Sequence, residues 1–397
     1  MIKELREKYN REFNESKYNE FIEALNNKNG YKIDFRIAET PIFLSKEFKK
    51  KIFTAVDEIV STITSDAYLD QVNHAVPSSL LVPNETPHAD MLSIDFAICM
   101  DQDNEPTPQL IELQGFPSLY FYQLLLNRKF RKFFTVPDNM ENYFSGLDED
   151  SYISEMRQTI IGDADPENVI LLEIEPHKQK TLVDFTMTEK FLGIKTVCIS
   201  DVIKEGKKLF YKGNDSLVPV EKIYNRVIFD ELLARHDIEY QFQFQDDLDV
   251  EWIPHPNWFF KISKFSMPFL KSEFIPEAKF LSDFPEYPSD LQNYILKPLF
   301  SFAGSGVKFD VTADLLDTIE DKSAYILQKK IQYAPVIETP DIPAKAELRI
   351  LMVWDKEKKT YMPVINLVRL SKGKMMGVDF NKNKTWVGSS IAYFEKD

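Results

Sequence analysis

The stretch YILKPLFSFAGSGVK, residues Tyr294–Lys308, decides how the rest of the chain is interpreted. Its first three residues are apolar and predict a strand that ends at Lys297, and a second strand is expected from Val307. Between them lies a small loop, Ser301–Gly306, whose backbone N–H groups could surround phosphates while the lysine ammonium supplies charge. The same residues also suit a plain β-hairpin with glycines at a tight turn, so both interpretations stay open at this point.

The composition limits the class of protein. The chain has 397 residues, 44% of them hydrophobic, and a formal net charge of −15, which argues against a nucleic-acid or anionic-membrane partner. Its length suggests more than one domain. Cys99 and Cys198 are too few for a disulfide framework, and the charged N-terminal segment does not resemble a signal peptide. We therefore expect a cytoplasmic protein without membrane spans.

Two carboxylates and an amide are predicted to meet on one hairpin. Residues 92–100 alternate between apolar and polar side chains, a turn cluster follows at 101–108, and residues 109–114 form the returning strand. This places Asp95 opposite Glu112 or its neighbour, with Gln114 on the same face. Oxygen ligands of this kind suit Mg²⁺. An exposed polar strand face would give the same pattern, although the continuation at 115–119, GFPSL, is unusual for a surface and favours a site.

The middle of the chain predicts an α/β unit. Residues 1 to about 75 read as helices that pack, without chemistry of their own. A strand at 169–172, a helix at 181–192 and a strand at 195–199 form a βαβ unit that lacks the glycine fingerprint of dinucleotide sites. The following strand carries Asn225 and Arg226 among apolar residues. Arg226 either faces a cleft for an anionic substrate group or pairs with Asp230 or Glu231.

The order of these pieces resembles the circularly permuted branch of the ATP-grasp enzymes, the glutathionylspermidine synthase-like proteins. The resemblance rests on the hairpin motif around Asp95 and Glu112 and on Lys297-Pro298-Leu299 followed by a glycine loop. It implies an α/β (α+β) fold in permuted order. The implied parts are an N-terminal helical segment at 1–75, metal-binding strands at 76–165, an α/β domain resembling a pre-ATP-grasp domain at 166–260 and a nucleotide-binding part at 261–397.

The same resemblance assigns roles to residues. It implies Mg²⁺ at Asp95, Glu112 and Gln114, and ATP at Lys264, Lys297, Gly304, Ser305, Gly306, Gln328 and Lys329. It further implies an acceptor substrate at Ser118, Asn225 and Arg226, and catalytic support from Arg226, Arg349 and Arg369. The chain departs from the family's pattern in three places: Gln114 replaces an asparagine, Ser93 replaces an arginine, and Phe302-Ala303 stands where an Arg-Glu pair is expected.

The resemblance implies an ATP- and Mg²⁺-dependent ligase that joins a small-molecule or peptide carboxylate to an amine through an acyl phosphate. It also suggests a homodimer, while the net charge argues against a nucleic-acid or membrane partner. Two alternatives stay open: a degenerate ATP-grasp protein that binds a nucleotide or a partner without turnover, and a small-molecule kinase of the same fold. Ser93 and Gln114 favour the degenerate form.

Overall fold

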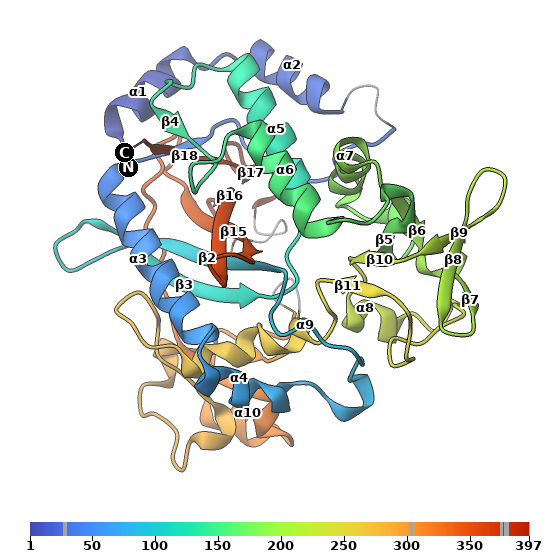
Figure 1. Cartoon of the computed structure of the whole chain (residues 1–397). Coiled ribbons are helices and arrows are strands. Elements are labelled where there is room, and N and C mark those ends of the chain that lie inside the picture. Colours follow the sequence, from blue (N-terminus) through green and yellow to red (C-terminus); the bar gives the residue numbers. More distant parts are fainter. Residues whose placement is uncertain (27–29, 302–304, 374–375, 377–380, 397) are drawn as a thin grey trace.

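The computed structural model describes residues 1–26, 30–301, 305–373, 376 and 381–396, and its centre is a five-stranded antiparallel sheet (Figure 1). The strand order is β17-β16-β15-β2-β3. Two of these strands come from the first third of the chain and three from its end. Their bounds are β2 Met91–Met100, β3 Pro106–Gln114, β15 Lys345–Asp355, β16 Thr360–Ser371 and β17 Gly388–Ser390.

The alternation predicted for the first hairpin is present. Asp95 pairs with Glu112 and Ser93 pairs with Gln114, so the predicted register is confirmed. The register shifts beyond Asp95, because Phe96 pairs with Leu110, and this leaves Ile111 as the extra residue of a β-bulge. Since β3 is the edge strand of the sheet, the bulge lies where a neighbouring element can use the free backbone groups of Ile111.

A smaller antiparallel sheet, in the order β12-β14-β13, lies beside this edge. The strand predicted from Tyr294 is β13, but the second strand expected from Val307 is wrong: only Lys308 bridges to Leu296. After Lys308 the backbone bends at residues 309 and 310, so the ladder stops at this one bridge. β13 pairs instead with β14. The bounds are β12 Ala278–Phe280, β13 Tyr294–Pro298 and β14 Tyr325–Lys329, with α10 at Ala313–Asp317 and a 3-10 helix at Lys264–Phe269.

The predicted βαβ unit belongs to a four-stranded parallel sheet, β11-β10-β5-β6, which projects to one side of the molecule (Figure 1). Its apolar strands are covered by α7 and α8, and an antiparallel sheet, β7-β8-β9, extends it. The bounds are β5 Val169–Glu173, α7 Leu182–Leu192, β6 Lys195–Cys198, β7 Ile203–Glu205, β8 Lys208–Lys212, β9 Leu217–Val220, β10 Lys222–Asn225, α8 Phe229–Ala234 and β11 Glu251–Ile253. The short helix α9, Trp258–Lys261, leads back to the sheet edge.

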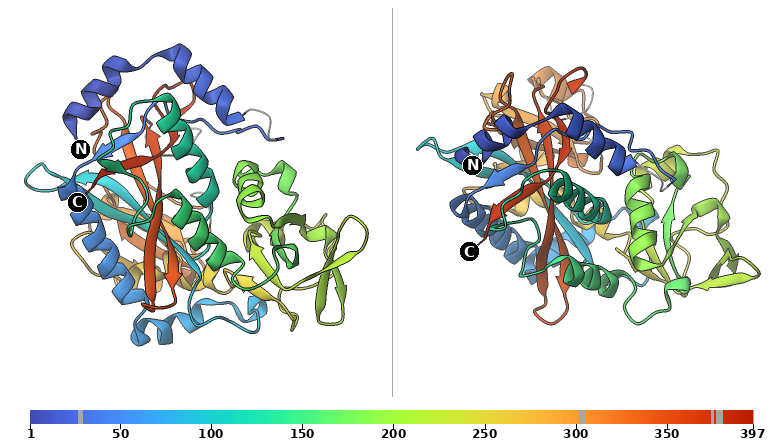
Figure 2. Two further views of the ribbon diagram at one scale, coloured as in Figure 1. Left: turned by 45° about the horizontal axis from the view of Figure 1, so that its top comes forward. Right: turned by 90° about the horizontal axis from the view of Figure 1, so that it is seen from above.

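Helices cover both faces of the central sheet. α3 packs on the face that carries Ile94 and Phe96, and α5 packs on the face that carries Leu351 and Val353. The first 75 residues are largely helical, as expected, but they also contain β1, which pairs with β18 and so holds both chain ends on one side (Figures 1 and 2). The bounds are α1 Lys3–Glu12, α2 Glu15–Asn26, β1 Ile42–Leu44, α3 Lys46–Ile63, α4 Asp66–Val72, α5 Tyr120–Phe133, β4 Met140–Glu141, α6 Glu149–Ile160 and β18 Ala392–Glu395.

Among the described residues, no helix combines the length and the apolar character needed to cross a bilayer.

Candidate functional site

Charged side chains form a row across one face of the central sheet. Glu112 on β3 is paired with Asp95 on β2, and Asp95 is paired with Arg349 on β15. Cross-strand partners on one face lie within contact distance, so this register alone brings the three groups together. Asp95 is completely buried and Arg349 is 9% exposed. The hypothesis of an exposed polar strand face is therefore wrong for Asp95.

Arg349 holds Asp95 through both of its carboxylate oxygens. The guanidinium Nε donates to Oδ1 and Nη2 donates to Oδ2, each at 2.6 Å. Such a forked pair is the strongest ion-pair geometry that proteins use, and it fixes both side chains in place. Burial opposes the charge on Arg349, but the contact with Asp95 outweighs it and raises the pKa of the guanidinium.

A second ion pair lies next to the first. Arg369 on β16 is the cross-strand partner of Glu347 on β15 and donates a hydrogen bond to its carboxylate. Nη2 of Arg369 also donates to Oδ2 of Asp95 at 3.3 Å, and the hydroxyl of Tyr333 donates to Oε2 of Glu347 at 3.2 Å. The two arginines predicted to be catalytic are thus joined through one buried carboxylate.

Two buried lysines approach the sheet edge from the other side. Lys297, at 5% exposure, donates to the carbonyl of Ile111, the bulge residue, at 3.0 Å. The structure shows no ion pair to Lys297 among the residues that it describes. Burial lowers the pKa of its ammonium to about 8, with Glu112 acting in the opposite direction and Lys264 adding to the decrease. A buried ammonium held by one carbonyl is costly unless an anion joins it.

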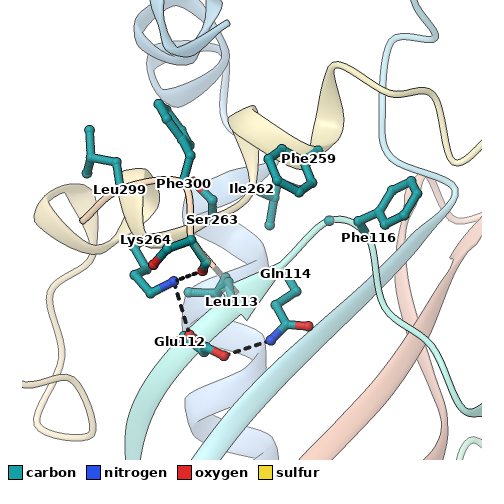
Figure 3. Close-up of a pocket in the computed structure, with 12 residues that line it drawn as sticks. Glu112, Leu113, Gln114, Phe116, Phe259, Ile262, Ser263, Lys264, Leu299 and Phe300 are labelled. Carbon is teal, nitrogen blue, oxygen red and sulfur yellow. Dashed lines mark hydrogen bonds and ion pairs between the residues drawn. The ribbon is translucent and has the colours of Figure 1, made fainter. Parts of the chain in front are cut away.

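Lys264 connects the 3-10 helix to the same edge strand (Figure 3). Its ammonium donates to the carbonyl of Ser301 at 2.5 Å and lies 3.6 Å from Oε2 of Glu112. The other oxygen of Glu112 accepts a hydrogen bond from the amide of Gln114 at 2.7 Å. Burial would raise the pKa of Glu112, but the positive charges led by Lys264 and Lys297 outweigh it and lower that pKa.

A pocket opens between Lys264 and the segment that follows β3 (Figure 3). It encloses about 360 Å³ of empty space, including its open mouth. Gly115 forms part of the pocket wall. Only glycine fits at this position, because a Cβ atom there would lie 2.5 Å from the carbonyl oxygen of Trp258. The lining combines the polar side chains of Glu112, Gln114 and Lys264 with the apolar side chains of Phe116, Phe259, Ile262, Leu299 and Phe300.

Phe116 links this pocket to the residues predicted for an acceptor substrate. The guanidinium carbon of Arg226 lies 4.8 Å from the Phe116 ring centroid, and its Nη1 donates to the carbonyl of Pro117 at 2.6 Å. Nε of Arg226 and Nδ2 of Asn225 are buried without a partner among the described residues. No bond joins Arg226 to Asp230 or Glu231, the alternative considered from sequence, while Ser118 lies half-buried on the loop that Arg226 contacts.

The predicted nucleotide residues divide into two groups. Gln328 on β14 is completely buried, and neither atom of its amide has a partner among the described residues. It pairs with Ile295, two residues before Lys297, and so shares that lysine's face of the small sheet. Lys329 points the other way and pairs with Glu277 at 3.0 Å. Ser305 and Gly306 are exposed, the latter with a φ of +73°, and Gly304 lies outside the described residues.

Sequence reasoning missed two carboxylates. Glu347 stands two residues before Arg349, and the alternation of that strand already places both on one face. Glu173 ends β5 at 5% exposure, and burial raises the pKa of its carboxyl to about 8. Only its position after four apolar residues, 169–172, could have drawn attention to it, because the end of a parallel strand is a common place for a ligand group.

The donor set fits a polyphosphate better than a metal. Lys264, Lys297 and the unpartnered amide of Gln328 suit the phosphates and base of a nucleotide such as ATP. Mg²⁺ at Asp95, Glu112 and Gln114 requires oxygens that are open to a cation. Both oxygens of Asp95 are taken by Arg349, and the described residues contain no group of three His, Cys, Asp or Glu placed to hold a metal. The magnesium prediction is untested, but these three side chains do not fit it as they stand.

Comparison with known proteins gives a structural relationship only. No protein-family model matches the chain, and no curated protein matches its sequence. Among solved structures it is similar to a glutathione synthetase-like effector from Globodera pallida in its apo form, with a TM-score of 0.58 and 11% identity. The alignment covers 96% of this chain and 96% of that one. The mixed α/β architecture of this chain is therefore similar in fold to that glutathione synthetase-like structure over nearly the whole length of both chains.

Proposed function

We propose that this chain binds ATP between the edge of its five-stranded sheet and its three-stranded sheet, and that it uses ATP to join a carboxylate to an amine. The observation that carries the proposal is the pair of buried lysines, Lys264 and Lys297, at the bulged edge strand beside the unpartnered amide of Gln328. Buried lysines are rare without a partner, and a polyphosphate would supply that partner. The ATP-grasp order proposed for these parts is the circularly permuted one.

In the proposed reaction, a carboxylate oxygen attacks the γ-phosphorus of ATP, ADP leaves, and an amine displaces phosphate from the acyl phosphate to give an amide. Phosphoryl transfer depends mainly on alignment and on neutralising charge. Lys264 and Lys297 would hold phosphate oxygens, and Arg369, whose side chain is 43% exposed, would reach the transferred group. The carboxylate substrate would lie toward Ser118, Asn225 and Arg226, along the pocket wall formed by Phe116. The proposed assembly of the enzyme is a homodimer of this chain.

A second candidate function is nucleotide binding without turnover. The forked pair between Arg349 and Asp95 favours this second function. Both oxygens of Asp95 accept hydrogen bonds from Arg349, whereas the ATP-grasp enzymes use the corresponding carboxylate to bind their metal. ADP release on addition of pooled carboxylates and amines separates the candidates. A ligase gives stimulated ADP release and a new amide mass, whereas a kinase gives a phosphorylated product. Tight ATP binding with no stimulated ADP release by any pool would reject the ligase and leave the binding protein.

A further inference from the structure

Arginine side chains hold both oxygens of the buried Asp95 carboxylate. Each oxygen accepts a hydrogen bond from Arg349 at 2.6 Å, and Oδ2 accepts a further one from Arg369 at 3.3 Å. A metal ion at Asp95 would have to displace Arg349 and leave a buried guanidinium without its partner. Removing one member of a buried pair is strongly unfavourable, so the guanidinium competes effectively with any cation that comes from solvent.

The rest of the cluster keeps both arginines in place. Glu347 accepts from Arg369 and from the hydroxyl of Tyr333, and the direct cross-strand register sets Arg349 beside Asp95. Three strands, β2, β15 and β16, contribute side chains to this one network. The strand register of the sheet therefore determines where Asp95 and the two arginines lie.

Fixed positive charge exceeds negative charge around the proposed phosphate site. Lys264, Lys297, Arg349 and Arg369 all act on the pKa of Glu112, while the carboxylates of the cluster are Glu112, Asp95 and Glu347. In a low-dielectric site such fixed charges attract an anion strongly. The chain itself thus offers cationic groups to the phosphates at this edge of the sheet.

We propose that these guanidinium and ammonium groups take the place of a divalent metal, so that the polyphosphate of a nucleotide binds to this chain without Mg²⁺. The proposal rests on the ATP site proposed above. It assigns Arg349 a positioning role, since it neutralises Asp95, and it assigns Arg369, Lys264 and Lys297 the direct contacts with phosphate oxygens. Glu112 has no arginine partner among the described residues, and Lys264 lies 3.6 Å from it.

Calorimetric titration of ATP in EDTA, and again in excess Mg²⁺, tests the proposal on the wild-type chain. The two dissociation constants should agree within about threefold. A gain of about tenfold or more in Mg²⁺ would overturn the metal-free site while leaving the ATP site intact. The absence of ATP binding in both buffers would overturn the proposed function and this inference together.

Variants of the ion pair add a second test. Arg349→Met removes the forked pair and leaves Asp95 only its contact with Arg369, so ATP should bind about tenfold more weakly in EDTA and recover in Mg²⁺. The double variant Asp95→Asn, Arg349→Met removes both partners, and it should bind weakly in both buffers. Lys279→Met on β12, whose side chain is 53% exposed, is the matched control and should behave like the wild type. If Arg349→Met binds as tightly as the wild type in EDTA, the proposal fails; if that variant does not fold, the wild-type titration still decides.

Discussion

At Lys297, burial works against the charge that the ammonium carries. Lys297 lies at the end of β13, and its described hydrogen bond goes to the carbonyl of a bulge residue. Its pKa, about 8, places the loss of charge within an easily accessible pH range. A phosphate-binding role therefore predicts a pH dependence that an ordinary surface lysine would not show.

We expect the affinity for ATP to fall as the pH rises above about 8, because the unliganded ammonium then loses its proton and binding must restore it. The decrease should approach about tenfold per pH unit well above that value. Calorimetry between neutral and alkaline pH measures it. Lys297→Arg keeps its charge throughout and should bind with a nearly constant affinity, so an identical decline in that variant would contradict the assignment to Lys297.

Glu173 gives a separate prediction about stability. Burial holds its carboxyl protonated in the folded chain up to about pH 8, whereas the unfolded chain releases the proton near the ordinary value of 4.5. Between these two values the folded state binds more protons, so its contribution to stability is present at low pH and is lost as the pH rises. Each pKa unit corresponds to about 1.4 kcal/mol, so the effect should be measurable.

Glu173→Gln should therefore leave stability nearly unchanged at pH 4 and increase it by more than about 1 kcal/mol at pH 8. The amide keeps an oxygen that can accept from the N–H group of Ile174, as the carboxylate does at 2.7 Å. Urea unfolding at both pH values measures the difference, with Glu205→Gln on the exposed part of β7 as the control. An equal change at both pH values would show that Glu173 is not protonated.

At the residue scale, the sequence predicts faces but not partners. Alternation along residues 347–353 places Glu347 and Arg349 on one side of a strand. Which carboxylate Arg349 meets depends on β15 lying beside β2, more than 200 residues away in the chain. No local pattern carries that information. The forked pair that closes Asp95 could therefore not be predicted, although Asp95 itself was identified.

At the scale of elements, α5 depends on a residue outside it. The helix begins after Leu119, which has a φ of +74° and provides no side-chain cap. Asp184 on α7 accepts instead from the N–H groups of Leu119, Phe121 and Tyr122, at 2.9, 2.9 and 2.8 Å. A carboxylate at a helix N-terminus also interacts favourably with the helix dipole. The loop GFPSL and the start of α5 are thus held by the α/β part of the chain.

Asp184→Ala should lower the free energy of unfolding by about 2 to 4 kcal/mol, because three N–H groups at a buried helix end lose a charged acceptor together. Asp148→Ala removes an ordinary cap from α6 at an exposed site and should cost about 1 kcal/mol. Urea denaturation of the two variants compares these costs directly. A loss for Asp184→Ala no greater than that for Asp148→Ala would contradict the account of α5.

Helices and strands with regular apolar spacing could be predicted from the sequence. Short strands that exist only because they pair with a distant strand could not. The strand over residues 92–100 and the helix over 182–192 follow from their apolar spacing. The strand expected from Val307 is reduced to one bridge because the backbone bends after Lys308, and β12 could not be predicted because three residues carry too short a pattern. β14 finds its partners in β12 and β13, neither of which signals the pairing in its own sequence.

At the scale of the molecule, the central sheet joins distant parts of the chain. β2 and β3 pair with each other, and β15, from the end of the chain, lies against β2. The parallel sheet falls within residues 166–260, while the central sheet is shared between 76–165 and 261–397. Local periodicity could not predict this sharing. The family resemblance implied it, because it placed the metal-binding strands ahead of the nucleotide-binding half.

The reactivity of Cys99 on β2 reports on the integrity of the central sheet, and Cys198 on β6 serves as the reference. Cys99 is 5% exposed on β2, and burial raises the pKa of its thiol to about 12, whereas Cys198 is half-buried. Because the thiolate is the reactive form, an alkylating reagent should modify Cys198 first and Cys99 only when the sheet opens. Mass spectrometry over a urea series measures both. Labelling of Cys99 at the rate of Cys198 in buffer would contradict the burial of β2.

Calorimetric titration of ATP into the wild type, Lys297→Ala and Lys279→Ala tests the central claim most directly. Lys297 is buried between the two sheets, whereas the side chain of Lys279 is 53% exposed on β12. We predict one ATP per chain for the wild type, affinity lower by at least about tenfold for Lys297→Ala, and no change for Lys279→Ala. Equal affinity in the wild type and Lys297→Ala, or no binding to the wild type, would contradict a nucleotide site between the sheets.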